Sequence, residues 1–506
     1  MTNVAPELAR RWRDRPSTDL PRILIMVPVA ILVVALATTF VGTQDVTTTK
    51  ELVLPLAGLA AITLAAVGCY RFEWFVLAVL AVRTLVDVSK IKPATNAVAV
   101  TGTAPSAGSS GTAASALAIL FIAMAVLWLL AQHKAGKAQS VSFIDAAFVF
   151  FVGTCALSVV GSVNRTASLT EVARVVAAVM MFIVVERLLT SVERIRRVLV
   201  ACFVAAVPPI LLGGLQAVTG RGRFVTAGVS RVLGTFLHPN TFGFFLSMFI
   251  LMAIALYPHC EQRVQLGLIG MIVVCGAMLL LTYSRGAWVA CVLGLLLIGL
   301  LQSRRIFVML IAGGIVTVAA VPSVLSRISN LGSGTTVTGS SGNSLSWRFG
   351  YWSEVLGLNH NNPITGIGLK GTKYLTDQSK APHNDYLRAY AETGVLGLLG
   401  FLLVLLAFIA VARRALRQAR PGIERGIAVG FAAVLVAYLI DSFGDNLMSE
   451  VVVLWYFYTF AACALAVARL GTPPPPKLPP APKVAEEREA KRVRAAHTRR
   501  RRVAIA

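Results

Sequence analysis

The sequence predicts an all-α fold, a polytopic transmembrane helical bundle of about 12–14 spans. Hydrophobic residues make up 56% of the 506 residues and charged residues only 14%, whereas a soluble chain carries about a quarter charged residues. Apolar runs of about twenty residues recur along the chain, and each is long enough for a helix to cross a bilayer. The short alternating segments of a transmembrane barrel are absent. Helices are therefore the elements expected to span the membrane.

Fourteen candidate spans follow from these apolar runs. They cover residues 22–42, 51–69, 72–89, 114–131, 142–162, 171–189, 196–218, 241–257, 264–282, 286–302, 305–325, 394–412, 426–442 and 451–468. Two divisions rest on very short polar links, Tyr70-Arg71 and Tyr283-Ser284-Arg285.

The distribution of basic residues predicts which side each connection faces. With the N-terminus inside, the even-numbered connections are basic, and the odd-numbered ones are mostly rich in Gly, Ser, Thr and Asn. Cytoplasmic loops carry the excess of Lys and Arg in membrane proteins. The net charge of +24 is therefore interpreted as attraction to anionic membrane lipids rather than to nucleic acid. The protein is expected to be multi-pass in the cytoplasmic (inner) membrane.

This orientation divides the chain into five segments. They are a cytoplasmic tail (1–21), a first set of transmembrane helices (22–325), a large extracytoplasmic loop (326–393), C-terminal transmembrane helices (394–470) and a Pro-rich basic tail (471–506). The last segment ends in four consecutive arginines and is predicted to be disordered and cytoplasmic. A motif for a proline-recognising partner is the alternative interpretation of that tail.

The large loop contains most of the candidate chemistry. Tyr351 and Trp352 belong to an aromatic run suited to stacking on sugar rings, although an interfacial aromatic belt explains such residues equally well. His383 opens a stretch that is expected to begin a helix near the membrane surface. A neutral imidazole there is suited to accept a proton from a hydroxyl nucleophile. No histidine and carboxylate pair has convincing metal-ligand spacing, so no metal and no cofactor is predicted.

Several arginines lie on the predicted outer face, where the topology rule disfavours them. Arg231 precedes a Gly-Thr-Phe-Leu-His-Pro-Asn stretch that holds His238 and Asn240, Arg285 lies between two spans, and Arg348 lies in the loop. Guanidinium groups bind phosphate in a bidentate manner, and several together suit a diphosphate. An ordinary snorkelling residue at the end of a span is the alternative for Arg285. Within the third span, Arg83 and Asp87 are spaced as an intramembrane ion pair.

Taken together, these motifs resemble the O-antigen ligase and O-antigen polymerase superfamily of bacterial envelope glycosyltransferases. The matching stretches are Gly234–Asn240, Ser284–Trp288, Arg348, His383–Leu387 and Glu392–Gly397. Their order and their placement on one face carry the resemblance, which covers roughly residues 230–410.

The resemblance implies a metal-independent, inverting glycosyltransferase of the GT-C type. Its donor would be a polyprenyl-diphosphate-linked glycan at the outer face of the cytoplasmic membrane, and its acceptor a hydroxyl of a glycan, lipid or protein. Arg285 and Arg348 match residues thought to engage the diphosphate, and His383 matches the proposed base. Arg231, His238, Asn240, Asn384, Tyr351 and Trp352 are the expected substrate-binding residues.

Three alternatives stay open at this point. Ligase and polymerase use the same donor chemistry and differ only in the acceptor, so the motifs do not separate them. A polytopic solute transporter fits the hydropathy, but it predicts internal repeats around a midplane site, and no convincing repeat is found. A non-catalytic scaffold leaves the arginine and histidine arrangement unexplained.

Overall fold

The computed structural model describes residues 62–86, 112–135, 142–226, 229–303, 344–377 and 379–471, with a few further residues between 305 and 313. The two predicted tails, the first predicted span and Asp87 lie outside the described residues, as does most of the predicted span at 305–325. Within the described residues the chain is helical almost throughout, apart from one short hairpin. The predicted all-α bundle is confirmed.

The described helices are numbered in chain order. Their bounds are α4 (Phe72–Val86), α5 (Thr112–Lys134), α6 (Phe143–Ser158), α7 (Arg165–Leu188), α8 (Val192–Thr219), α9 (Pro239–Leu256), η2 (Tyr257–His259), α10 (Gln262–Leu281), α11 (Arg285–Gln302), α14 (Ser344–Gly357), α15 (Gly371–Leu375), α16 (Asp385–Gln418), α17 (Ile423–Asp441), η3 (Leu447–Ser449) and α18 (Val451–Gly471). Between α8 and α9, β1 (Phe224–Thr226) pairs antiparallel with β2 (Val229–Arg231).

Polar side chains begin several of these helices. Ser142 and Asp145 form a reciprocal capping box at the start of α6, and Asn164 and Ser191 cap α7 and α8. These contacts satisfy backbone N–H groups that have no partner within the helix. Gly220 ends α8 in a left-handed conformation (φ 72°), which glycine adopts without a steric penalty.

Nine helices in the described part of the chain are long and apolar enough to cross a membrane. The protein is a multi-pass membrane protein. Burial separates central from peripheral helices. Of the 18-residue apolar stretch in each helix, 94% is buried in α18 and 83% in α9, against 22% in α5 and in α10. The outer helices therefore present apolar side chains to lipid, where no hydrophobic force drives them inward.

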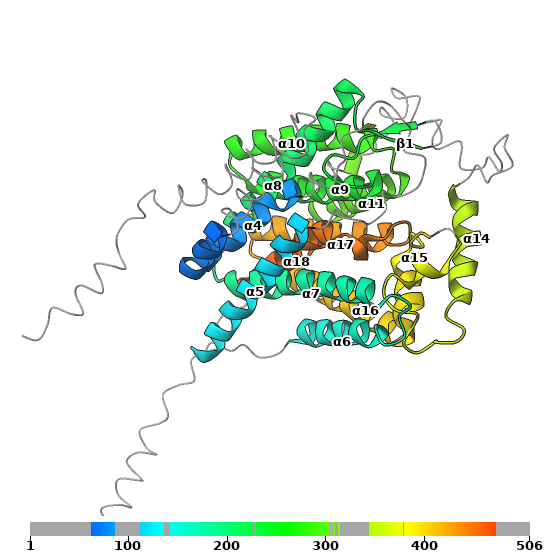
Figure 1. The fold of residues 1–506 in the computed structure, drawn as a ribbon. Coiled ribbons are helices and arrows are strands. Elements are labelled where there is room, and N and C mark those ends of the chain that lie inside the picture. Colours follow the sequence, from blue (N-terminus) through cyan, green and yellow to red (C-terminus); the bar gives the residue numbers. More distant parts are fainter. Residues whose placement is uncertain are drawn as a thin grey trace, which may run out of the picture.

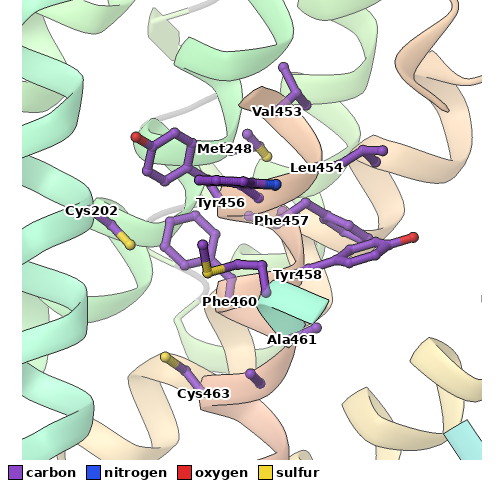
Figure 2. Packing of buried hydrophobic residues seen from close by; sticks show 14 of the residues in the cluster. Cys202, Met248, Val453, Leu454, Tyr456, Phe457, Tyr458, Phe460, Ala461 and Cys463 are labelled. Carbon is purple, nitrogen blue, oxygen red and sulfur yellow. The ribbon is translucent and has the colours of Figure 1, made fainter. Parts of the chain in front are cut away.

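Aromatic side chains on α18 fill the centre of the bundle. Figure 2 shows Tyr456, Phe457, Tyr458 and Phe460 projecting from this helix among residues of neighbouring helices. The rings of Phe457 and Tyr438 stack with centroids 4.3 Å apart, and the Tyr456 hydroxyl donates to the carbonyl of Leu80 in α4 (2.7 Å). This dense packing fixes α17 and α18 relative to α4 and α9.

The large loop and the hairpin gather at one end of the bundle (Figure 1), which we call the loop end. There, α14 runs across the bundle helices, and its Tyr351 hydrogen-bonds Thr376 at the end of α15. The starts of α9, α11 and α16 and the C-terminus of α17 lie at the same end because neighbouring helices alternate in direction.

Helix α16 is interrupted close to its start. Gly394 has φ 69° and ψ −169°, which divides a short N-terminal helix from the long span. A loop segment satisfies the freed backbone groups: Ile367 and Gly368 N–H donate to Ala391 and Glu392 carbonyls, and Val395 N–H donates to the Pro363 carbonyl. The large loop is thus hydrogen-bonded into the break itself.

A set of buried ionic side chains also holds the loop to the bundle, and we call it the loop latch: Glu171, Lys370, Thr372, Arg388 and Glu392. Lys370 Nζ lies 2.7 Å from Glu171 Oε1, and Arg388 Nε lies 2.9 Å from Glu392 Oε2. Thr372 donates to the other Glu392 oxygen (2.6 Å). The latch therefore joins α7, the α15 region and the first part of α16.

Candidate active site

His383 lies at the loop end, just before α16, in a constrained peptide. Its φ is 50°, which is unusual for a residue with a side chain. Trp352 Nε1 donates to the preceding Pro382 carbonyl (2.7 Å), and Asn384 caps α16 by accepting from Leu387 N–H (3.0 Å). The surrounding contacts thus hold a strained backbone in place, a pattern found at functional sites.

A carboxylate that the sequence analysis missed faces this histidine. Asp445 Oδ1 lies 3.2 Å from His383 Nδ1. Because a carboxylate accepts, Nδ1 carries the proton and the lone pair lies on Nε2. Burial would raise the pKa of Asp445, but the hydrogen bond and charge interaction with His383 hold it below its ordinary value.

Asp445 belongs to a segment, residues 442–450, that is fastened to the start of α16. The Asp385 N–H donates to the Ser442 carbonyl (2.8 Å), and Met448 N–H donates to both carboxylate oxygens of Asp385 (3.0 and 3.2 Å). Arg388 donates to the Ser449 hydroxyl. Asn384 caps α16, whereas Asp385 holds the segment that carries Asp445.

His238 approaches the same point from α9. Its ring centroid lies 6.0 Å from that of His383, and its Nδ1 accepts from Asn240 N–H (3.2 Å). Burial, together with the nearby His383, Arg231 and Arg348, lowers the pKa of His238 to about 4, against a smaller opposing effect of Asp445.

Arg231 ties the hairpin to two helices. Its Nε donates to the Thr282 carbonyl (2.6 Å) and its Nη2 to Asn240 Oδ1 (2.6 Å). These contacts give Arg231 and Asn240 a supporting role behind His238, while direct contact of either with a substrate stays a prediction. Nearby, Arg223 donates to carbonyls at the end of α8.

Arg348 and Arg285 flank a second carboxylate, Asp441. Burial lowers the pKa of Arg348, opposed by the charges of Asp445 and Asp441. Asp441 lies over the first turn of α11, because a methyl group on Gly286 would come within 2.6 Å of its Oδ1. Arg285, the first residue of that helix, is therefore brought to the same region as Arg348. We call His238, Arg348, His383, Asp441 and Asp445 the histidine site.

The two predicted sugar-stacking residues serve the loop in this structure. Tyr351 is 1% exposed, packs with Val355 and Ala391, and hydrogen-bonds Thr376 (2.8 Å) and the Lys380 carbonyl. Trp352 is half-buried and supports the His383 peptide, as described above. Stacking of either on a sugar stays a prediction.

Three buried oxygens in the histidine site or directly beside it have no hydrogen-bond partner among the described residues. They are Oδ2 of Asp441, Oδ2 of Asp445 and Oδ1 of Asn446. Buried polar atoms are nearly always paired, and exceptions mark sites where a ligand or water is bound. In the part of the chain that the structure describes, no three His, Cys, Asp or Glu side chains are grouped to hold a metal ion.

A comparison with known protein families identifies the family of the region that contains His383. Residues 270–402 match the family model described as O-antigen ligase. Those residues belong to the O-antigen ligase family, and the predicted resemblance is confirmed. The match supports an O-antigen ligase-like membrane glycosyltransferase activity at family level. No curated protein sequence matched the chain.

The ligase match covers only part of the histidine site. Arg285, Arg348 and His383 lie inside the matched residues, whereas His238 precedes them and Asp441 and Asp445 follow them. A signal for Asp445 existed in the sequence: Asp441 to Asn446 form a polar run with two carboxylates at the end of an apolar span. Asp445 lies 62 residues beyond His383 in the sequence, so only the fold brings the two side chains together.

Proposed function

We propose that the protein transfers a glycan from a polyprenyl diphosphate to an acceptor hydroxyl at the outer face of the cytoplasmic membrane. The observation that supports this most directly is the contact between His383, which lies in the O-antigen ligase match, and Asp445, which follows it, beside two arginines. The acceptor is a glycan, lipid or protein. The outer-face placement rests on the clusters of Lys and Arg in the even-numbered connections, which leave the odd-numbered connections, and with them the site, outside.

In this mechanism His383 is the general base. Its Nε2 takes the proton of the acceptor hydroxyl as the oxygen attacks the anomeric carbon, and the Asp445 carboxylate stabilises the resulting imidazolium. The bond between the anomeric carbon and the diphosphate oxygen breaks, and its electron pair leaves with the diphosphate. Attack opposite the leaving group inverts the anomeric configuration.

Arg285 and Arg348 stabilise the departing diphosphate. Charge develops on its oxygens as the bond breaks, and positioned guanidinium groups lower the energy of that state. A diphosphate is a good leaving group and needs no protonation, so arginines suffice in place of a metal ion. Before the donor binds, the Asp445 carboxylate supplies negative charge that faces Arg348.

Deleting the gene tests this function directly. The deletion strain should lose one envelope glycan and accumulate its polyprenyl-diphosphate precursor, measured by mass spectrometry of extracted lipids. Purified wild-type protein added to membranes of that strain should consume the precursor in the presence of EDTA, and His383→Ala protein should not. An unchanged pool of lipid-linked glycans in the deletion strain argues against a transferase.

The outer-face assignment has its own test. Single cysteines at Ser340 and Ser379, in a protein whose native cysteines are replaced, should react with an impermeant reagent in intact cells. A cysteine at Thr472 should react only after the cells are opened. The reverse pattern would place the site on the cytoplasmic face.

A further inference from the structure

The tautomer of His238 follows from its contact with the start of α9. Its Nδ1 accepts the Asn240 N–H (3.2 Å), so Nδ1 holds the lone pair. A pKa of about 4 keeps the ring neutral at ordinary pH, and the one proton of a neutral ring is then on Nε2. His238 is therefore a neutral hydrogen-bond donor, whereas His383 has its lone pair on Nε2 and its proton toward Asp445.

The two rings are spaced for one shared oxygen. An oxygen hydrogen-bonded to an imidazole nitrogen lies about 4 Å from the ring centroid, because the hydrogen bond itself spans about 2.8 Å. The centroids of His238 and His383 are 6.0 Å apart, which is less than twice that reach. Nε2 of His238 has no hydrogen-bond partner among the described residues.

We propose that His238 and His383 together hold the acceptor hydroxyl, which donates its proton to Nε2 of His383 and accepts from Nε2–H of His238. This inference rests on the proposed glycosyl transfer and adds the second residue that binds the acceptor. The hydrogen bond from His238 occupies one lone pair of the hydroxyl oxygen. The second lone pair is then the one that attacks the anomeric carbon. The proton still passes to His383, and the electron pair of the broken bond still leaves with the diphosphate.

The pair of contacts also defines the acceptor's chemical class. A hydroxyl oxygen has two lone pairs and can accept from His238 while it attacks with the other. A neutral amine has a single lone pair, which the His238 contact would occupy. The site is therefore selective for hydroxyl acceptors over amines, and the transferred glycan should be linked through oxygen.

Two substitutions of His238 separate this role from helix capping. In His238→Asn the side-chain oxygen still caps α9, as asparagine does in general, but the distant N–H donor is lost. In His238→Gln the amide nitrogen keeps a donor near the position of Nε2, and the cap is weakened. The assay mixes each purified variant with membranes of the deletion strain, which contain accumulated donor and unmodified acceptor.

We expect His238→Asn to transfer glycan at least about tenfold more slowly than His238→Gln, the effect of about 1.4 kcal/mol on a barrier. Retention of the lipid-linked donor by the purified protein should be the same in both. His360 is an exposed histidine of the large loop, and His360→Asn should behave as wild type. The opposite order, or equal rates in the two variants, overturns the proposal. A glycan linked to the acceptor through nitrogen also overturns the proposal. If the wild-type protein transfers no glycan, the proposed function itself is wrong.

Discussion

The loop latch and the histidine site lie at the same end of the bundle, and both bury charged side chains, but they differ in how those charges are satisfied. In the latch, the carboxylates of Glu171 and Glu392 each contact a cation, and neither contributes to the buried side-chain atoms of the described residues that have no hydrogen-bond partner. In the histidine site, one oxygen each of Asp441 and Asp445 is left unpaired.

This difference separates a structural role from a functional one. A buried ion pair whose hydrogen bonds are complete leaves nothing for a ligand to add, and it fixes the position of the groups that form it. Unpaired carboxylate oxygens beside two arginines and two histidines are costly unless a substrate or water meets them. We therefore expect substitutions in the latch to change stability first, and substitutions in the histidine site to change activity first.

The largest effect on activity is expected for His383→Ala. Removal of a positioned general base costs about 10²–10⁴ in rate, so transfer should nearly cease while the protein keeps its thermal stability and binds donor. Turnover and donor retention in purified, detergent-solubilised protein are the measurements.

Asp385→Asn is the matched comparison for His383→Ala. Its side chain still accepts from Met448 N–H, so the loss of rate should be far smaller. If Asp385→Asn is inactive and His383→Ala turns over normally, the base is the Asp385 carboxylate and the role given to His383 is wrong.

For the latch we expect the reverse pattern. Arg388→Met leaves the fully buried Glu392 carboxylate without its cation, and an uncompensated buried charge costs about 3–5 kcal/mol. Thermal unfolding in detergent should begin at a markedly lower temperature. Adding Glu392→Gln should recover part of the loss, and a fully stable but inactive Arg388→Met protein would move Arg388 into the site.

The fold class could be predicted from the sequence because lipid imposes a simple rule: apolar runs long enough to cross the membrane must form helices. The start of a helix after His383 was accessible for a similar reason, since Asn384 is a strong capping residue. The link between Thr282 and Arg285 also divides two helices as expected.

Contacts between distant segments were not accessible in the same way. Nothing near His383 in the sequence indicates Asp445, and the pairing depends on how α17 and α18 pack beside the start of α16. The inward direction of Tyr351 was equally hidden, because an aromatic run in a loop has the same composition whether its rings face substrate or core. The catalytic and binding roles of all these residues stay predictions.

Stability should respond to the titration of His238. Its pKa falls from the ordinary 6.5 to about 4 in the folded protein, so between these pH values the unfolded chain binds a proton that the folded protein does not. Stability is therefore complete above about pH 6.5 and declines as the pH falls toward 4.

The shift corresponds to roughly 3 kcal/mol at most, and we expect about 2 kcal/mol because the side chain is only half-buried. Unfolding temperatures of the wild type and His238→Asn at pH 7.5 and 4.5 give the measurement. The wild type should lose more stability than the variant over this interval, and an equal loss would assign the acid sensitivity to other groups.

The smallest effect is expected for the arginines that face the diphosphate. Arg285→Lys and Arg348→Lys keep the positive charge but lose the fork that binds two phosphate oxygens at once. Each should lower transfer by at least about tenfold, which corresponds to about 1.4 kcal/mol in the barrier, with little loss of protein from the membrane. Arg221→Lys is the control, because Arg221 is exposed at the same end of the bundle and lies outside the histidine site. Full activity in both Arg285→Lys and Arg348→Lys would remove the diphosphate contact from the mechanism. The two arginines would then serve only as partners of Asp441 and Asp445, a structural role like that of the cations in the loop latch.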